Sequence, residues 1–137
     1  MGRILAIDYG MKRTGVAVSD PLRIIAGGLE TVPTAQIMQW LEKYIGSNGV
    51  DIVVVGRPTR MDGSPSETLP HIEKFVEKAR SRFPGVRFEW WDERFTSVLA
   101  QRAIRESGVP KMKRRDKGLV DKVSATIILQ GYMENML

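Results

Sequence analysis

The hydrophobic positions of the chain follow two different periods, and the changes between them predict its elements. Short apolar runs at residues 4–7 and 16–18 are typical of strands that are covered on both faces. Their close spacing predicts a β-hairpin, in which Gly10 and Gly15 bracket a basic turn. A third, shorter strand is expected over residues 28–32.

Over residues 37–45 the apolar residues lie three or four positions apart, which predicts a helix. Residues 51–56 form a β-branched run that is typical of a central parallel strand. A second helical pattern covers residues 69–83, and residues 86–92 alternate like a strand. Strand–helix alternation after a hairpin predicts a mixed α/β sheet with helices on both faces.

The last third of the sequence predicts two more helices, separated by a polar, basic loop. Thr96 or Ser97 is placed to cap the first of them. The loop is expected over residues 108–118 and the final helix over residues 119–136. The apolar residues expected on the core side of that final helix are Val120, Val123, Ile127 and Tyr132. We therefore expect one α/β domain over residues 1–137, built on a five-stranded mixed sheet.

Composition narrows the class of protein. The 137 residues include no cysteine, which excludes disulfides, thiolate zinc sites and cysteine nucleophiles. No apolar run approaches the roughly 20 residues that span a bilayer, so we expect a cytoplasmic protein without a membrane partner. The net charge is +5, and eight Lys or Arg lie among residues 102–122 with three acids. Clustered positive charge favours a polyanionic partner, because local counterion release drives phosphate binding.

Carboxylates follow the predicted parallel strands at the points where those strands end. Asp8 ends the first strand, and Asp92 and Glu93 end the fifth. In sheets of this kind, sites form beyond the carboxyl ends of the parallel strands, so we expect these acids at one edge. Asp121 is expected in the first turn of the last helix, where the helix dipole favours a carboxylate. Structural roles also fit: Asp8 as a turn cap, Asp121 as a helix-end acid, and Glu93 as a surface partner of Arg94.

The chemistry of these acids favours a metal site. Carboxylates that share a cleft raise each other's pKa unless a divalent cation neutralises them. Oxygen ligands without His or Cys favour Mg²⁺ or Mn²⁺, and two such ions can support phosphodiester cleavage. His71, the single histidine, belongs to the second predicted helix, away from this edge. The pattern therefore predicts metal-dependent hydrolysis and disfavours Ser-His chemistry.

The sequence resembles the YqgF family along its whole length. The matching stretches are residues 6–20 (AIDYGMKRTGVAVSD), 55–58 (VGRP) with 61–63 (MDG), 92–97 (DERFTS), and 117–121 (KGLVD) with 127–130 (IILQ). This family comprises bacterial proteins described as Holliday junction resolvases and as pre-16S rRNA processing nucleases, with a ribonuclease H-like fold. The resemblance implies a ribonuclease H-like α/β fold here. It also implies that Asp8, Glu93 and Asp121 are the acidic, metal-holding site residues.

Basic residues accompany these acids and are candidates for contacts with phosphates. Lys12 and Arg13 lie at the predicted hairpin tip, and Arg94 follows Glu93 directly. Arg57 stands where the family often has an apolar residue, and either contacts phosphate or is solvated. The candidates in the basic loop are Lys111, Lys113, Arg114, Arg115 and Lys117.

Three functions remain open at this point. The favoured one is a metal-dependent endonuclease on structured nucleic acid, either precursor ribosomal RNA or branched DNA. It is expected as a monomer or weak homodimer, with ribosomal subunit precursors as partners. The alternative is a non-catalytic RNA-binding ribosome-assembly factor whose acids are structural. The third is an ATPase-like switch, because sugar kinases and actin-like ATPases share this core, although they need two such lobes.

Overall fold

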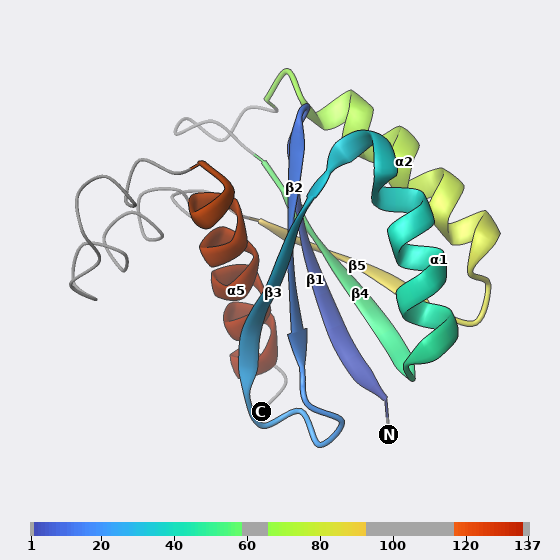
Figure 1. Cartoon of the computed structure of the whole chain (residues 1–137), viewed down its shortest axis with the longest axis vertical. Helices are drawn as coiled ribbons and strands as arrows, with labels where there is room; N and C mark the ends of the chain where they lie inside the picture. The colour runs from blue at the N-terminus through green and yellow to red at the C-terminus, as the bar shows by residue number, and fades with distance from the viewer. Residues whose placement is uncertain (1, 59–65, 93–116, 136–137) are drawn as a thin grey trace.

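The computed structural model describes residues 2–58, 66–92 and 117–135, with only the backbone of residues 117–121. Within these ranges five strands form one sheet in the order β3-β2-β1-β4-β5 (Figure 1). The elements are β1 (Arg3–Tyr9), β2 (Arg13–Ser19), β3 (Ala26–Pro33), the 3₁₀ turn η1 (Thr34–Gln36), α1 (Ile37–Ser47), β4 (Val50–Arg57), α2 (Leu69–Arg82), β5 (Arg87–Asp92) and α5 (Lys117–Asn135). The helix expected after Thr96 or Ser97 lies outside the described residues. Among the described helices, none has the length and apolarity needed to cross a membrane.

The strand pairings confirm the predicted mixed sheet. β1 pairs antiparallel with β2, and β2 pairs antiparallel with β3, so the first two apolar runs form the expected hairpin. β1 pairs parallel with β4, and β4 pairs parallel with β5. The carboxyl ends of β1, β4 and β5 therefore lie at one edge of the sheet, where sites form in folds of this kind.

Helices cover both faces of the sheet, as expected (Figure 1). Leu5 and Ile7 of β1 belong to the hydrophobic cluster that includes α1 and α2. Ile4 and Ala6 of the same strand belong to the cluster that includes α5. Because side chains alternate along a strand, β1 is buried on both faces and its parity tells which helix layer each residue meets.

The face that α5 turns toward the sheet differs from the predicted one. Among the residues of α5 whose side chains the structure describes, the buried ones are Ser124, Ala125, Ile128 and Leu129. Of the residues expected there, Val123, Ile127 and Tyr132 are half-buried, and the side chain of Val120 is not described. Apolar residues occur nearly all around this helix, so its hydrophobic period does not single out one face.

Two glycines allow α5 to lie close to the sheet. A Cβ atom on Gly28 of β3 would lie 2.9 Å from Cγ of Lys122 and 3.0 Å from Oγ1 of Thr126. A Cβ atom on Gly131 of α5 would lie 2.7 Å from Cζ2 of Trp91 on β5. A side chain at either glycine would push the helix or the ring away, so these contacts help to set the rotation of α5.

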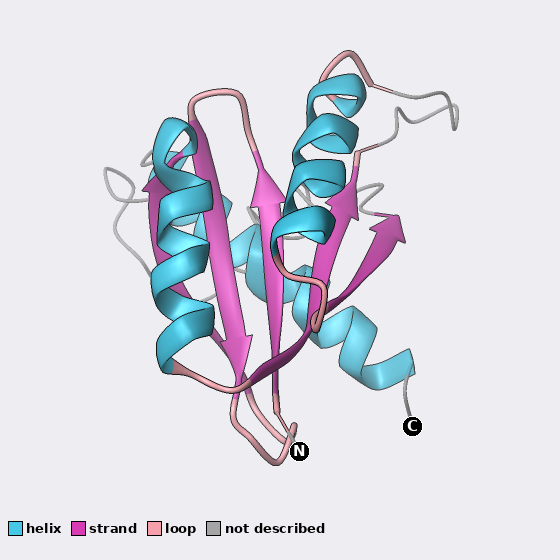
Figure 2. Cartoon of the chain, turned by 90° about the vertical axis from the view of Figure 1, so that its right-hand side faces the viewer, coloured by secondary structure: helices cyan, strands magenta, loops and turns pink. Residues whose placement is uncertain are grey.

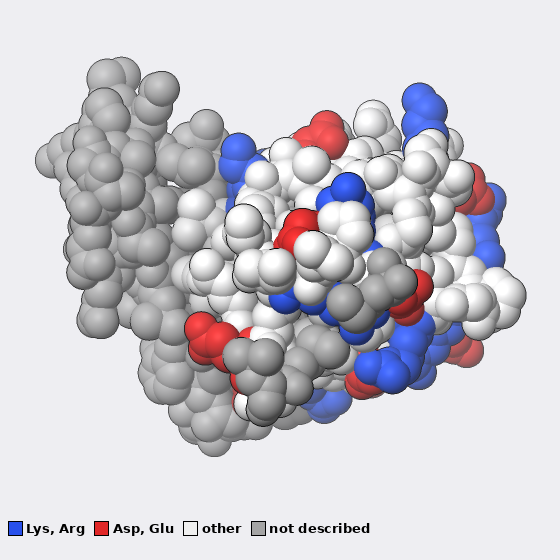
Figure 3. Space-filling view, turned by 90° about the horizontal axis from the view of Figure 1, so that it is seen from below, with Lys and Arg blue, Asp and Glu red and all other residues white. Residues whose placement is uncertain are grey.

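The turn between β2 and β3 lies at the end of the sheet opposite the carboxyl ends of β1, β4 and β5. The Asp20 carboxylate accepts hydrogen bonds from the backbone N–H groups of Leu22 (3.2 Å), Ile24 (2.7 Å) and Ile25 (2.7 Å). These bonds, above all the one from Ile25, hold the pKa of Asp20 below its ordinary value. Ile24 is 70% exposed on this rigid turn. Figure 3, which views the molecule from this end, shows a broad uncharged area between scattered charged side chains.

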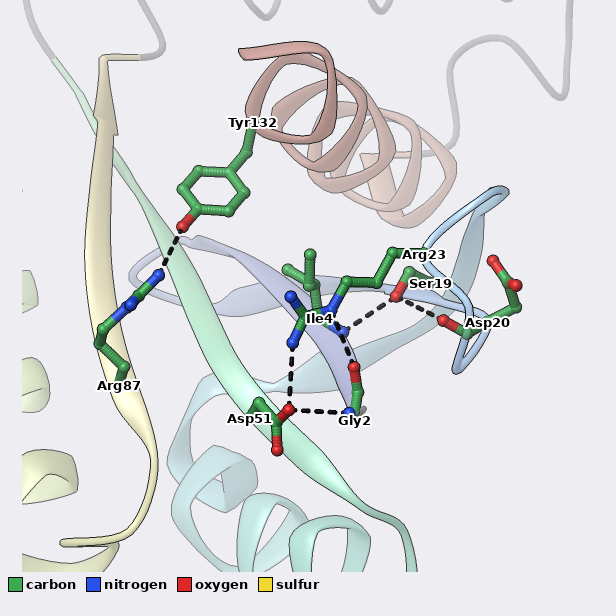
Figure 4. Close-up of polar contacts among 8 residues, drawn as sticks. All are labelled: Gly2, Ile4, Ser19, Asp20, Arg23, Asp51, Arg87 and Tyr132. Atoms are coloured by element: carbon green, nitrogen blue, oxygen red, sulfur yellow. Dashed lines mark hydrogen bonds and ion pairs between the residues drawn. The ribbon is translucent and has the colours of Figure 1, made fainter. Parts of the chain in front are cut away.

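Arg23 fixes this turn to the start of the sheet (Figure 4). Its φ of 58° lies in the left-handed region, which is costly for a residue other than glycine. The Arg23 guanidinium donates to the carbonyl oxygen of Gly2 (3.0 Å) and to Oδ2 of Asp51 (3.0 Å). Asp51 also accepts a hydrogen bond from the N–H of Gly2 (2.7 Å). These contacts offset the backbone strain.

Candidate active site

Asp8 lies near the carboxyl end of β1 with a glycine on each side of it in the sheet. Gly15 of β2 is its direct antiparallel partner. The parallel register of Ile7 with Val55 places Gly56 of β4 next to Asp8 on the other side. Gly15 and Gly56 are both buried, and Asp8 is half-buried. Asp8 thus lies at the edge where the parallel strands end, which is where sites form in folds of this kind.

The carboxylate of Asp8 is on the α5 side of the sheet. Asp8 shares its strand parity with Ile4 and Ala6, which pack against α5. The N-terminal end of α5 lies at the same end of the molecule as the carboxyl ends of β4 and β5 (Figure 1). The backbone of α5 therefore begins near the edge at which Asp8 sits.

Asp121 occupies a different helical position from the one expected. α5 begins at Lys117, and its first turn contains no acid, so Asp121 lies one turn further along. The helix starts earlier than predicted, because it includes Lys117 and Gly118, which are expected in the loop. Position 121 still shares a helical stripe with Ser124, Ala125 and Ile128, which are buried against the sheet. The backbone thus places Asp121 on the sheet-facing stripe of α5.

Several predicted site residues lie outside the described part of the chain. They are Glu93, Arg94, Lys111, Lys113, Arg114 and Arg115, and the side chain of Lys117 is not described either. β5 ends at Asp92, the residue that precedes Glu93. Among the described residues, no group of three or more His, Cys, Asp or Glu side chains is gathered for a metal. The three-acid site therefore remains a prediction.

The hairpin turn is shorter than the two glycines suggested. β1 ends at Tyr9 and β2 begins at Arg13, so the turn is residues 10–12 and Gly15 lies inside β2. Only glycine fits at Gly10, because a Cβ there would collide with the backbone carbonyl of Arg13. Lys12 is exposed at the tip, whereas Arg13 is half-buried and pairs with Pro33.

Thr34 holds this hairpin, and the sequence did not identify it as a site residue. Its side-chain Oγ1 donates to the carbonyl oxygen of Gly10 at 2.6 Å. The Oγ1 atoms of Thr34 and Thr14 lie 2.9 Å apart, so the Thr14 hydroxyl donates to Thr34 once the Thr34 proton is used. The backbone N–H of Thr34 donates to the carbonyl oxygen of Lys12 (3.0 Å). No short-range pattern marks these partners, because they become neighbours only when β3 pairs with β2.

Arg57 lies on the face opposite Asp8. It ends β4, and its guanidinium carbon is 5.9 Å from the centre of the Trp90 ring, in cation–π range. Trp90 packs with the α1 and α2 cluster, whereas Trp91 packs with α5 and Tyr132. Trp90 and Trp91 are therefore both used in packing. Arg57 lies at the same edge of the sheet as Asp8, but on the opposite face.

Comparisons with known proteins agree with this architecture. A family model described as RuvX, Holliday junction resolvase, matches residues 2–135. A protein of Porphyromonas gingivalis named "Putative pre-16S rRNA nuclease" is 55% identical over 98% of both chains. A protein of Bacteroides thetaiotaomicron with the same name is 50% identical over 98% of both chains.

Two solved structures share the fold at low sequence identity. The fowlpox virus resolvase, solved with Holliday junction DNA, has a TM-score of 0.60 and 13% identity, covering 98% of this chain and 99% of its own. The RuvC protein of T. thermophilus, solved with a Holliday junction substrate, has a TM-score of 0.54 and 17% identity, covering 99% and 96%. These likenesses confirm the predicted ribonuclease H-like α/β fold.

Proposed function

Because the chain belongs to the RuvX family of Holliday junction resolvases, which is a nuclease family, we propose that it is a metal-dependent endonuclease acting on structured nucleic acid. We further propose that residues 1–137 form one domain whose catalytic acids are Asp8, Glu93 and Asp121. Two substrate classes are compatible with the names of its relatives: precursor ribosomal RNA and branched DNA. As partners we propose ribosomal subunit precursors, and as assembly state a monomer or weak homodimer.

The observation that carries this proposal is the position of Asp8 near the carboxyl end of β1, a central strand that pairs parallel with β4. The carboxyl ends of β1, β4 and β5 lie at this same edge of the sheet. The sheet-facing stripe of α5 brings the backbone of Asp121 to the same face of the sheet. Acids that two separate elements bring to this edge support a ligand site, because ligands bind beyond the carboxyl ends of parallel strands.

The donor set fits a hard divalent cation. Carboxylate oxygens from Asp8, Glu93 and Asp121 would hold Mg²⁺ or Mn²⁺, which prefer oxygen ligands. When bound, such an ion supplies Lewis-acid polarisation of the phosphate and neutralises the repulsion among the acids. The protein itself orients the backbone of the nucleic acid: Lys12 at the hairpin tip is exposed and can reach a phosphate.

Other basic residues extend this role. Arg13 is half-buried at the start of β2 and supports the hairpin tip. Arg57, held over Trp90, would contact a phosphate of a strand that crosses this edge to the face opposite Asp8. We assign the same role to Arg94 and to the basic residues of the loop, Lys111, Lys113, Arg114, Arg115 and Lys117.

The test is a side-by-side cleavage assay with Mn²⁺, with Mg²⁺ and with a chelator. The substrates are a pre-16S rRNA fragment and a four-way DNA junction. The proposal expects cleavage of at least one substrate with a metal and none with the chelator. Binding of either substrate without metal-dependent cleavage would support the non-catalytic RNA-binding factor instead.

A further inference from the structure

A large groove lies between α1 and α2, on the face of the sheet opposite Asp8. Figure 2 shows the two helices side by side on this face. The groove has a volume of about 1010 Å³. This is the upper end of the roughly 300–1,000 Å³ of ligand pockets, so it has room for an extended segment. The ion pair of Glu42 with Arg82 joins the two helices along it.

One wall of the groove is basic. Lys74, Lys78 and Arg82 line it from α2, four residues apart, so they share one side of the helix. Lys74 and Lys78 are exposed, and Glu77 is the acid among the described lining residues. Arg82 is paired with Glu42, so Lys74 and Lys78 are the two cations of this wall that are placed to meet phosphates, one helical turn apart.

The inner part of the groove is apolar and aromatic. Tyr9 and Met38 line it, and the Tyr9 ring packs against Phe75 with ring centres 5.0 Å apart. An aromatic ring beside a basic wall is the combination that binds unpaired bases and their backbone.

The groove begins at the edge that holds the candidate active site. Tyr9 follows Asp8 directly in β1, and the two side chains project to opposite faces. Thr34 lines the groove and also fixes the hairpin that carries Lys12. A nucleic-acid strand that crossed this edge from the site would reach the groove at Tyr9.

We propose that this groove binds a single-stranded segment of the nucleic-acid substrate, with its phosphates along Lys74 and Lys78 and its bases against Tyr9 and Met38. This inference rests on the proposed nuclease function. It implies that the enzyme prefers substrates with an unpaired arm, such as a precursor RNA tail, to fully paired junctions. Unpaired bases can use an apolar floor, whereas a duplex keeps its bases stacked inside.

The test is fluorescence anisotropy of the full chain in EDTA, so that no cleavage occurs. The probes are a labelled single strand of about 12 nucleotides, as RNA and as DNA, and a duplex of the same sequence. Three variants are compared: the double variant Lys74→Gln/Lys78→Gln, the single variant Tyr9→Leu, and the control Lys43→Gln. Lys43 is an exposed lysine of α1 that does not line the groove. Circular dichroism melts check that each variant is folded.

The double lysine variant should weaken single-strand binding by about tenfold or more. It should also lower the slope of log K against log salt by about 0.7 per lost contact. Tyr9→Leu should weaken binding without changing that slope, and Lys43→Gln should change neither quantity. Duplex binding should change by less than about twofold, because the duplex does not enter the groove.

Two outcomes would overturn the groove assignment. One is single-strand binding by the double lysine variant that equals wild type. The other comes from a competition experiment with polyglutamate as the added polyanion. If polyglutamate displaces the RNA and the duplex equally, and Tyr9→Leu has no effect, the groove is a general anion-binding surface. Either result leaves the nuclease proposal standing if wild type cleaves and Asp8→Asn does not. Conversely, the absence of cleavage of both substrates with either metal would end the nuclease proposal, while the anisotropy series would still measure the groove.

Discussion

The hydroxyl of Thr34 donates a hydrogen bond of 2.6 Å to the carbonyl oxygen of Gly10. This bond joins the residue that follows β3 to the turn between β1 and β2. It fixes the turn directly beyond Asp8, at the edge where the candidate active site lies. The hairpin tip is therefore positioned by tertiary structure as well as by its own sequence.

Thr34→Val should destabilise the protein and disturb the hairpin. The valine removes the donor to Gly10 and leaves the buried Thr14 hydroxyl without this partner. The expected loss is about 1–3 kcal/mol of the free energy of unfolding, measured by urea denaturation. In cleavage assays KM should rise more than kcat falls, because Lys12 is displaced from its phosphate. Thr34→Ser, which keeps the hydroxyl, should restore both; equal behaviour of the two variants would contradict this role.

Gly131→Ala should destabilise the packing of α5 on β5. The added methyl would lie 2.7 Å from Trp91 Cζ2, and a bulky ring can move only by disturbing its neighbours. The matched control is Gly46→Ala in α1, where a Cβ meets nothing within 4 Å. Because alanine favours helix, Gly46→Ala should raise the free energy of unfolding by about 0.5–1 kcal/mol. Thermal melts of both variants give the comparison, and a stabilised Gly131→Ala would refute the close packing.

The turn at Asp20 should make stability depend on pH in the acid range. Its pKa is lowered in the folded protein, chiefly by the Ile25 N–H, so the folded state favours the ionised carboxylate. The resulting stabilisation is present above the unfolded pKa of about 3.9 and is lost as the pH falls below it, through the folded pKa. Asp20→Asn should therefore be less stable than wild type at neutral pH, and the difference should shrink in strong acid. Urea midpoints at both pH values measure this, and a constant difference would contradict it.

The sequence pattern was sufficient for the sheet but not for the rotation of its last helix. The continuous apolar runs of β1, β2 and β4 mark strands that are buried on both faces, and the strand-end rule led to Asp8 and its edge. The buried face of α5 was misjudged, because its apolar residues surround the helix and contacts at Gly28 and Gly131 help to decide its rotation. Such contacts exist only after the chain has folded.

The candidate site shows the same division between local and long-range signals. Asp8 could be found because a carboxylate that ends an apolar run is locally unusual. Thr34 could not be found, because its side-chain partners lie 20 and 24 residues away in the sequence. The early start of α5 moved Asp121 out of the first turn but kept it on the sheet-facing stripe. The proposed roles of Asp8, Glu93 and Asp121 await the experiment.

The most direct measurement is the Mn²⁺-dependent cleavage rate of wild type, Asp8→Asn and the control Asp20→Asn. The substrates are the pre-16S rRNA fragment and the four-way junction, and binding is measured in parallel in EDTA. Asp8→Asn should lower the rate by about 100-fold or more while binding and folding persist. Asp20→Asn, at the opposite end of the sheet, should cleave like wild type. Cleavage by Asp8→Asn at the wild-type rate would contradict the assignment of Asp8 to the active site.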